Sequence, residues 1–120
     1  MARGLDSEVG CGVSAYAQGR RVEWKVIHHL AENGYDTQRA ASSKGVADVI
    51  GFKAGQVVLV NVKRTSMPGP AERAELLRVA SLLPGLVPLV AIGLPRLTFR
   101  RLTGPRAADW TPWQADEMET

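Results

Sequence analysis

The segment Gly45–Lys63 (GVADVIGFKAGQVVLVNVK) constrains the fold of this 120-residue chain more than any other part of the sequence. It holds two runs rich in Val, Ile, Leu and Phe, separated by the short stretch Lys53-Ala54-Gly55-Gln56. Such runs on either side of a Gly-containing turn predict a β-hairpin. Polar side chains inside buried strands are costly unless they have partners, so Asp48, Asn61 and Lys63 require an explanation.

The alternation of side chains along a strand places these three polar residues on one face. If Ala54-Gly55 forms the hairpin loop, Asp48 lies opposite Asn61; if Gly55-Gln56 forms it, Asp48 lies opposite Lys63. Either register brings them together, with directly opposed Cβ atoms roughly 4.5–5.5 Å apart. The second strand is apolar on both faces, which predicts a central strand covered on both sides.

The remaining segments complete an α/β pattern. We expect a helix at 15–33, a strand at 35–41, the hairpin strands at 46–52 and 57–64, a helix at 71–83, a strand at 86–92 and an Arg-rich edge strand at 97–102. Residues 1–14 are expected to form a flexible arm and residues 15–104 the folded domain. Residues 105–120, an acidic segment with Trp110 and Trp113, show no pattern and are expected to be disordered or draped on the surface.

A carboxylate also lies on the apolar stripe of the first helix. Glu23 precedes apolar residues of that stripe by three, four and seven positions, so we expect it to face the sheet. Together with Asp48, the Asn61 amide and a backbone carbonyl, it would form an oxygen-rich site suited to Mg²⁺ or Mn²⁺. The Lys63 ammonium, two residues further on, would position a metal-bound water and stabilise developing phosphorane charge.

The charge and the single cysteine narrow the class of protein. Residues 15–104 carry 13 Lys or Arg and six Asp or Glu, a net charge of +7 that suits nucleic acid. Cys11 is the only cysteine, which excludes an intrachain disulfide. No apolar run reaches the roughly 18 residues of a membrane span, so we expect no membrane partner and a cytoplasmic setting, in a bacterial, archaeal or phage-infected cell.

The sequence resembles the PD-(D/E)xK nuclease superfamily and, within it, the archaeal-type Holliday junction resolvases and their bacterial and phage relatives. The matching stretches are GRRVEWKVIHHLAENGY, then R-x-x-x-S-x-G-x-x-D, then NVKR. The resemblance implies a restriction-endonuclease-like αβββαβ core with a central mixed β-sheet flanked by helices. It also implies a homodimer that uses Mg²⁺ or Mn²⁺ to hydrolyse two phosphodiesters of branched DNA, the four-way junction.

The resemblance assigns roles to individual residues. The catalytic set would be Glu23, Asp48, Asn61 and Lys63. The metal ligands would be Glu23, Asp48, Asn61 and the backbone carbonyl of Val62. By the resemblance, Arg39 and Ser43 would contact DNA. Independently of the resemblance, the basic residues Arg20, Arg21, Lys44 and Arg64 would contact its phosphates.

One position departs from the family pattern, because Asn61 stands where the motif has Glu or Asp. The amide keeps a ligand oxygen and loses one negative charge, which weakens metal binding. The chain could be a variant that still cleaves, carry an inactivating substitution, or be a non-catalytic junction-binding protein. Another nuclease of the restriction or single-strand type is a further alternative. Structural roles also stay open: hydrogen bonds in the turn for Asp48, a solvent-directed ammonium for Lys63, and pairing of Glu23 with Arg20 or Lys25.

Overall fold

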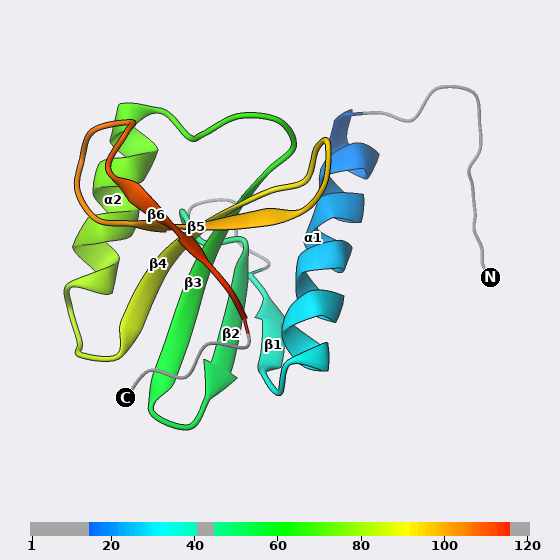
Figure 1. Cartoon of the computed structure of the whole chain (residues 1–120), viewed down its shortest axis with the longest axis horizontal. Helices are drawn as coiled ribbons and strands as arrows, with labels where there is room; N and C mark the ends of the chain where they lie inside the picture. Colours follow the sequence, from blue (N-terminus) through cyan, green and yellow to red (C-terminus); the bar gives the residue numbers. More distant parts are fainter. Residues whose placement is uncertain (1–14, 41–44, 116–120) are drawn as a thin grey trace.

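The computed structural model describes residues 15–40 and 45–115. In chain order its elements are α1 (Ala15–Glu32), β1 (Asp36–Arg39), β2 (Val49–Lys53), β3 (Gln56–Lys63), α2 (Pro70–Ala80), β4 (Leu86–Ile92), β5 (Thr98–Leu102) and β6 (Trp110–Trp113). Figure 1 shows the two helices on opposite sides of one twisted sheet, with β5 and β6 crossing over the central strands. No helix in this part of the chain is long and apolar enough to cross a membrane.

The sheet has six strands in the order β1-β2-β3-β4-β5-β6. All neighbours are antiparallel except β3 and β4, which run parallel because α2 carries the chain back between them. This is the predicted mixed sheet with flanking helices, and the predicted fold class is confirmed. The hairpin pairs Lys53 with Gln56, so Ala54 and Gly55 form the loop, as in the first of the two predicted registers.

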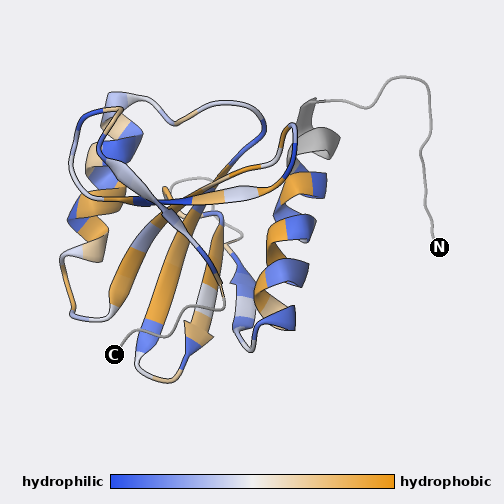
Figure 2. Ribbon diagram, in the orientation of Figure 1, coloured by the Kyte–Doolittle hydropathy of each residue, from blue (hydrophilic) through white to orange (hydrophobic). Residues whose placement is uncertain are grey.

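Each face of the sheet has its own apolar core. On one face α1 buries Val22, Val26 and Leu30 against strand residues such as Val58 and Val60. On the other face α2 contributes Leu76, which packs in a smaller cluster with residues that include Leu59, Val90, Ile92 and Leu102. Figure 2 shows the apolar colour concentrated in β3 and β4, the strands that both helices cover. The central strand is therefore buried on both faces, as its sequence predicts.

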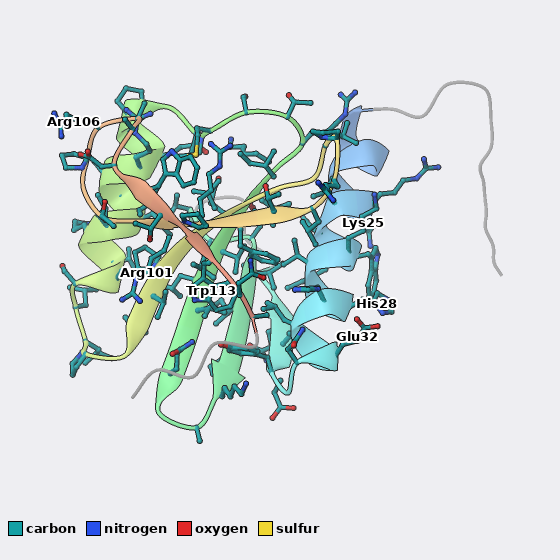
Figure 3. All side chains as sticks on the ribbon, viewed as in Figure 1. Lys25, His28, Glu32, Arg101, Arg106 and Trp113 are labelled. Carbon is teal, nitrogen blue, oxygen red and sulfur yellow. The ribbon has the colours of Figure 1, made fainter. Side chains whose placement is uncertain are left out.

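The segment after Leu102 differs from the prediction. It was expected to lack regular structure, yet β6 pairs with β5 through Phe99↔Trp113 and Leu102↔Trp110. The Trp113 side chain is buried in the α1-side core, with its ring 5.5 Å from the ring of Phe99; Figure 3 labels it beside β6, over the central strands. The prediction failed because Trp-Thr-Pro-Trp has no apolar periodicity, and large aromatic burial decides its structure instead.

Candidate active site

The predicted polar residues lie where β3 outruns its neighbour β2. The β2–β3 pairing ends at Val49↔Val60, whereas the β3–β4 pairing continues to Lys63↔Ile92. Residues Asn61–Lys63 thus have a strand partner on one side only. The backbone on their other side faces the segment that leads into β2, which contains Asp48.

Asp48 fills the gap that β2 leaves. Its backbone N–H donates to the Val60 carbonyl at 2.8 Å, and its Oδ2 accepts the Val62 N–H at 2.8 Å. The Asp48 carboxylate therefore accepts the hydrogen bond that a backbone carbonyl of a longer β2 would accept. The N–H and C=O of one strand residue point to the same edge, so the Val62 carbonyl is directed to the Asp48 side as well, as the predicted metal ligation requires.

Asn61 is 3% exposed and only half satisfied. Its Nδ2 donates to the Val46 carbonyl at 2.6 Å, while its Oδ1 is buried without a hydrogen-bond partner in the part of the chain described. Exchanging the amide oxygen and nitrogen would bring two oxygens together at that distance, so the contact fixes the amide orientation. A carboxylate at this position would face the same carbonyl without a proton to donate.

The environment of Asp48 opposes its ionisation. Burial raises the pKa of the Asp48 carboxyl above its ordinary value of 3.8, against the lowering effect of the Val62 N–H. The charges of Glu23 and Glu72 raise this pKa further, and the Lys63 ammonium lowers it. A carboxylate that is costly to ionise beside two other carboxylates favours a cation or a proton nearby.

Lys63 contacts an acidic residue that the sequence analysis did not identify. Its Nζ lies 3.0 Å from Oε1 and 3.3 Å from Oε2 of Glu72, in the first turn of α2. Glu72 follows the motif lysine by nine residues, so hairpin parity carries no information about it. The signal available in the sequence was its place in the first turn of a helix that the prediction began at Ala71, directly after the motif strand.

Glu23 comes from α1, and its charge raises the pKa of the Asp48 carboxyl. Its Oε1 accepts from Nε of Arg39 at 2.9 Å, and its side chain is 20% exposed. This partner, Arg39, comes from β1. The structure brings together Asp48, Asn61, Val62 and Lys63, and leaves Glu23 within electrostatic influence of Asp48.

The oxygen atoms at the end of β3 fit a hard divalent cation with few charged ligands. In the described ranges, 15–40 and 45–115, no three His, Cys, Asp or Glu side chains gather as a metal-binding group. The oxygen atoms that could serve as donors are the Asp48 carboxylate, the Val62 carbonyl and the buried, unpartnered Oδ1 of Asn61. Mg²⁺ commonly takes one or two carboxylates and completes its shell with water and substrate phosphate.

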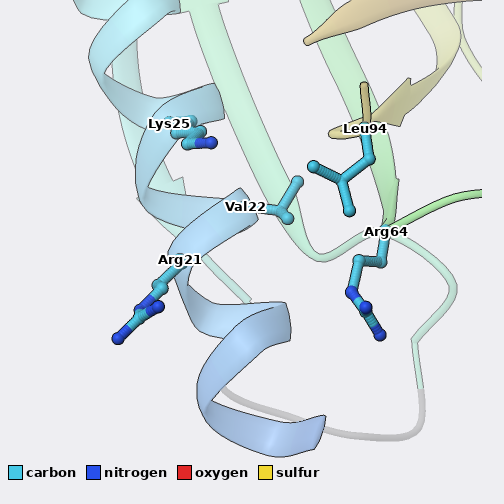
Figure 4. A pocket seen from close by; sticks show the side chains of 5 residues that line it. All are labelled: Arg21, Val22, Lys25, Arg64 and Leu94. Carbon is cyan, nitrogen blue, oxygen red and sulfur yellow. The ribbon is translucent and has the colours of Figure 1, made fainter. Parts of the chain in front are cut away.

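A basic pocket of about 230 Å³ opens beside α1, lined by Arg21, Val22, Lys25, Arg64 and Leu94. Figure 4 shows Arg21 and Lys25 on successive turns of α1, with Arg64 projecting from the end of β3 across from them. Because Arg64 directly follows Lys63, this pocket and the candidate active site share one end of the sheet.

The other predicted DNA contacts are less well placed by the structure. Arg39 is paired with Glu23, and Arg20 is half-buried on α1. Ser43 and Lys44 lie outside the described residues. Lys25 was not among the predicted DNA contacts, although it follows Arg21 by one helical turn.

Comparison with known proteins matches this chain to junction resolvases. The family model of the archaeal Holliday junction resolvase (Hjc) matches residues 14–70, from the start of α1 to the start of α2. Hjc from Archaeoglobus fulgidus, a Holliday junction resolvase from an archaeal hyperthermophile, is similar in structure with a TM-score of 0.57 and 25% sequence identity; the match covers 70% of each chain. A search of curated proteins gave no match. The predicted resemblance to archaeal-type Holliday junction resolvases is confirmed.

Proposed function

We propose that this chain, a relative of the archaeal Holliday junction resolvases in sequence and fold, is a divalent-metal-dependent endonuclease that resolves four-way DNA junctions as a homodimer. The observation that carries the proposal is the arrangement at the end of β3. There, at a strand end that β2 leaves open, the Asp48 carboxylate accepts the Val62 N–H, and the charge of the Lys63 ammonium lowers the pKa of that carboxyl. The +7 charge of residues 15–104 suits a polyanionic substrate.

The residues of the site divide the work of phosphodiester hydrolysis. A bound Mg²⁺ or Mn²⁺ would supply Lewis acidity and a water of lowered pKa. The Asp48 carboxylate, held by the Val62 N–H, and the Asn61 Oδ1 offer oxygen donors in fixed positions. The Lys63 ammonium neutralises charge on the phosphoryl oxygens as they become more negative in the transition state.

The basic pocket provides a place for the DNA backbone next to the reacting phosphate. Arg21, Lys25 and Arg64 put three cations around one opening, which suits a phosphate oxygen cluster better than a neutral ligand. A two-fold dimer would place two such sites on two strands of the junction, whose own symmetry matches that of the dimer. This explains why a domain with one active site would act on paired phosphodiesters.

Cleavage of a labelled four-way junction, with a linear duplex of the same sequence as the control, tests the proposal. In Mg²⁺ or Mn²⁺ the chain should cut the junction at paired positions near the branch point and leave the duplex intact. Asp48→Asn should abolish the cuts without changing the circular dichroism spectrum. Equal cutting of junction and duplex would point to a different nuclease on the same fold.

A second candidate, a junction-binding protein without cleavage activity, is favoured by one observation. The Asn61 amide donates to the Val46 carbonyl and is built into the structure, so the site lacks the acid of the motif. Tight, junction-selective binding with no cutting in either metal, and none after Asn61→Glu or Asn61→Asp, would establish this alternative.

A further inference from the structure

The candidate active site has no negative charge at motif position 61, but the carboxylate of Glu72 lies close to the motif lysine. Asn61 is neutral, and its Nδ2 is committed to the Val46 carbonyl. Glu72 comes from α2, on the same side of the sheet, and contacts the Lys63 ammonium with both carboxylate oxygens, at 3.0 and 3.3 Å. Its charge also reaches Asp48, whose pKa it raises.

The position of Glu72 is fixed by a buried neighbour. Arg73 is 8% exposed, and its guanidinium donates to the Pro68 carbonyl at 2.7 Å and the Pro105 carbonyl at 3.1 Å. These bonds tie the start of α2 to the segment that leaves β3 and to the loop before β6. The backbone of the first turn of α2, with Pro70 at its start and Glu72 within it, is therefore anchored to both of these segments.

The next acidic residue of α2, Glu75, forms an ordinary surface ion pair and serves as a comparison for Glu72. Glu75 pairs within its own helix, with Nη2 of Arg78 at 2.6 Å, and both side chains are about half exposed or more. Such a pair contributes little. The Glu72 side chain is equally exposed, at 46%, and differs in its partner: it reaches off its helix to the motif lysine of β3.

We propose that Glu72 is a positioning residue of the active site. It fixes the Lys63 ammonium beside Asp48 and supplies the negative charge that Asn61 lacks, so that cation binding at Asp48 depends on it. The proposal rests on the function proposed above and extends it to a residue beyond the region matched by the resolvase family model, which ends at residue 70.

Mn²⁺ binding to the full chain, measured by calorimetry and by the electron paramagnetic resonance of free Mn²⁺, tests this role without DNA. Glu72→Gln should weaken Mn²⁺ binding by roughly 10-fold, the low end of what outer-shell partners of a metal site contribute. Glu72→Asp should recover part of the affinity. Glu75→Gln, the matched control one helical turn away, should leave it within twofold of the original chain.

Thermal unfolding without metal provides the control for folding. Glu72→Gln and Glu75→Gln should unfold at similar temperatures, because both remove only a solvent-accessible pair. Equal Mn²⁺ affinities for these two variants, or no Mn²⁺ binding by the original chain, would overturn the role of Glu72. Binding that depends on Glu72, in a chain that cuts no junction, would uphold the role and contradict the proposed nuclease activity instead.

Discussion

The two ends of β3 each bury one side-chain amide, and the two amides are treated differently. At the hairpin end Gln56, 8% exposed, donates its Nε2–H to the hydroxyl of Tyr35 at 2.7 Å. At the other end Asn61, 3% exposed, bonds through its nitrogen and leaves its oxygen without a partner among the described residues. The Gln56 amide stabilises the packing of Tyr35, whereas the Asn61 amide has an oxygen that is available to accept a further bond.

The strand pairing explains the difference. The hairpin end is paired on both sides, with β2 through Val57↔Phe52 and with β4 through Val57↔Leu86. Beyond Val60 only β4 remains, and on the other side the Asp48 carboxylate, from the segment before β2, accepts the Val62 N–H in place of a strand. Buried polar groups are normally satisfied, so an unsatisfied acceptor near a carboxylate and a lysine supports placing the proposed active site at this end of the strand.

Replacing Asp48 should produce the largest effect and separate the two ends most clearly. We expect Asp48→Asn to reduce junction cleavage by at least about 100-fold, the loss typical when one electrostatic group of an active site is removed. The measurement is single-turnover cleavage at saturating protein. Gln56→Met is the control at the hairpin end and should leave the cleavage rate of the folded protein within twofold. A variant Asp48→Asn that still cuts at a comparable rate would contradict the assignment.

Isosteric apolar substitutions at the two amides should affect stability unequally. Gln56→Met removes the donor to the buried Tyr35 hydroxyl, and we expect it to lower the free energy of unfolding by about 1–3 kcal/mol. Asn61→Leu leaves the Val46 carbonyl without its donor but also removes an acceptor that was unpartnered, so its cost should be smaller. Urea unfolding of both variants gives the comparison. A larger loss for Asn61→Leu would show that the site end is the better satisfied of the two.

Much of this arrangement could be predicted from the sequence, because it depends on short-range rules. Strand alternation and a two-residue hairpin loop are enough to predict that Asp48 lies on the same face as Asn61 and Lys63. The helical stripe also put Glu23 near the sheet. The pairing of Glu23 with Arg39 and of Lys63 with Glu72 depends on how separate elements pack, which periodicity does not encode.

The basic pocket provides a further contrast between the two ends. Arg64→Ala and Lys25→Ala should each remove about one phosphate contact. Each should make the negative slope of log association constant against log salt concentration less steep by about 0.9. Lys53→Gln at the hairpin end is the matched control. The Lys53 ammonium donates to the Asn33 carbonyl and lies over the Tyr35 ring, so it is already held within the protein. Junction affinity measured at several salt concentrations tests this. An equal change of slope for Lys53→Gln would mean that DNA contacts both ends.

The smallest effect concerns the pH dependence of stability at the site end. Burial, together with Glu23 and Glu72, raises the pKa of the Asp48 carboxyl above 3.8 in the folded chain. The unfolded chain then releases this proton at a lower pH than the folded chain, so the contribution of Asp48 to stability falls as pH rises through that interval and stays lower above it.

Asp48→Asn keeps an oxygen for the Val62 N–H and has no charge to bury, so it should unfold at a higher temperature than the original chain at pH 7.5. The two proteins should converge as pH falls below about 4, where the carboxyl is neutral in both states. Thermal unfolding at a series of pH values measures the difference. Mg²⁺ or Mn²⁺ should narrow it at pH 7.5, because a cation stabilises only the carboxylate. If the difference in unfolding temperature does not change with pH, the Asp48 carboxyl is no costlier to ionise than a carboxyl on the surface.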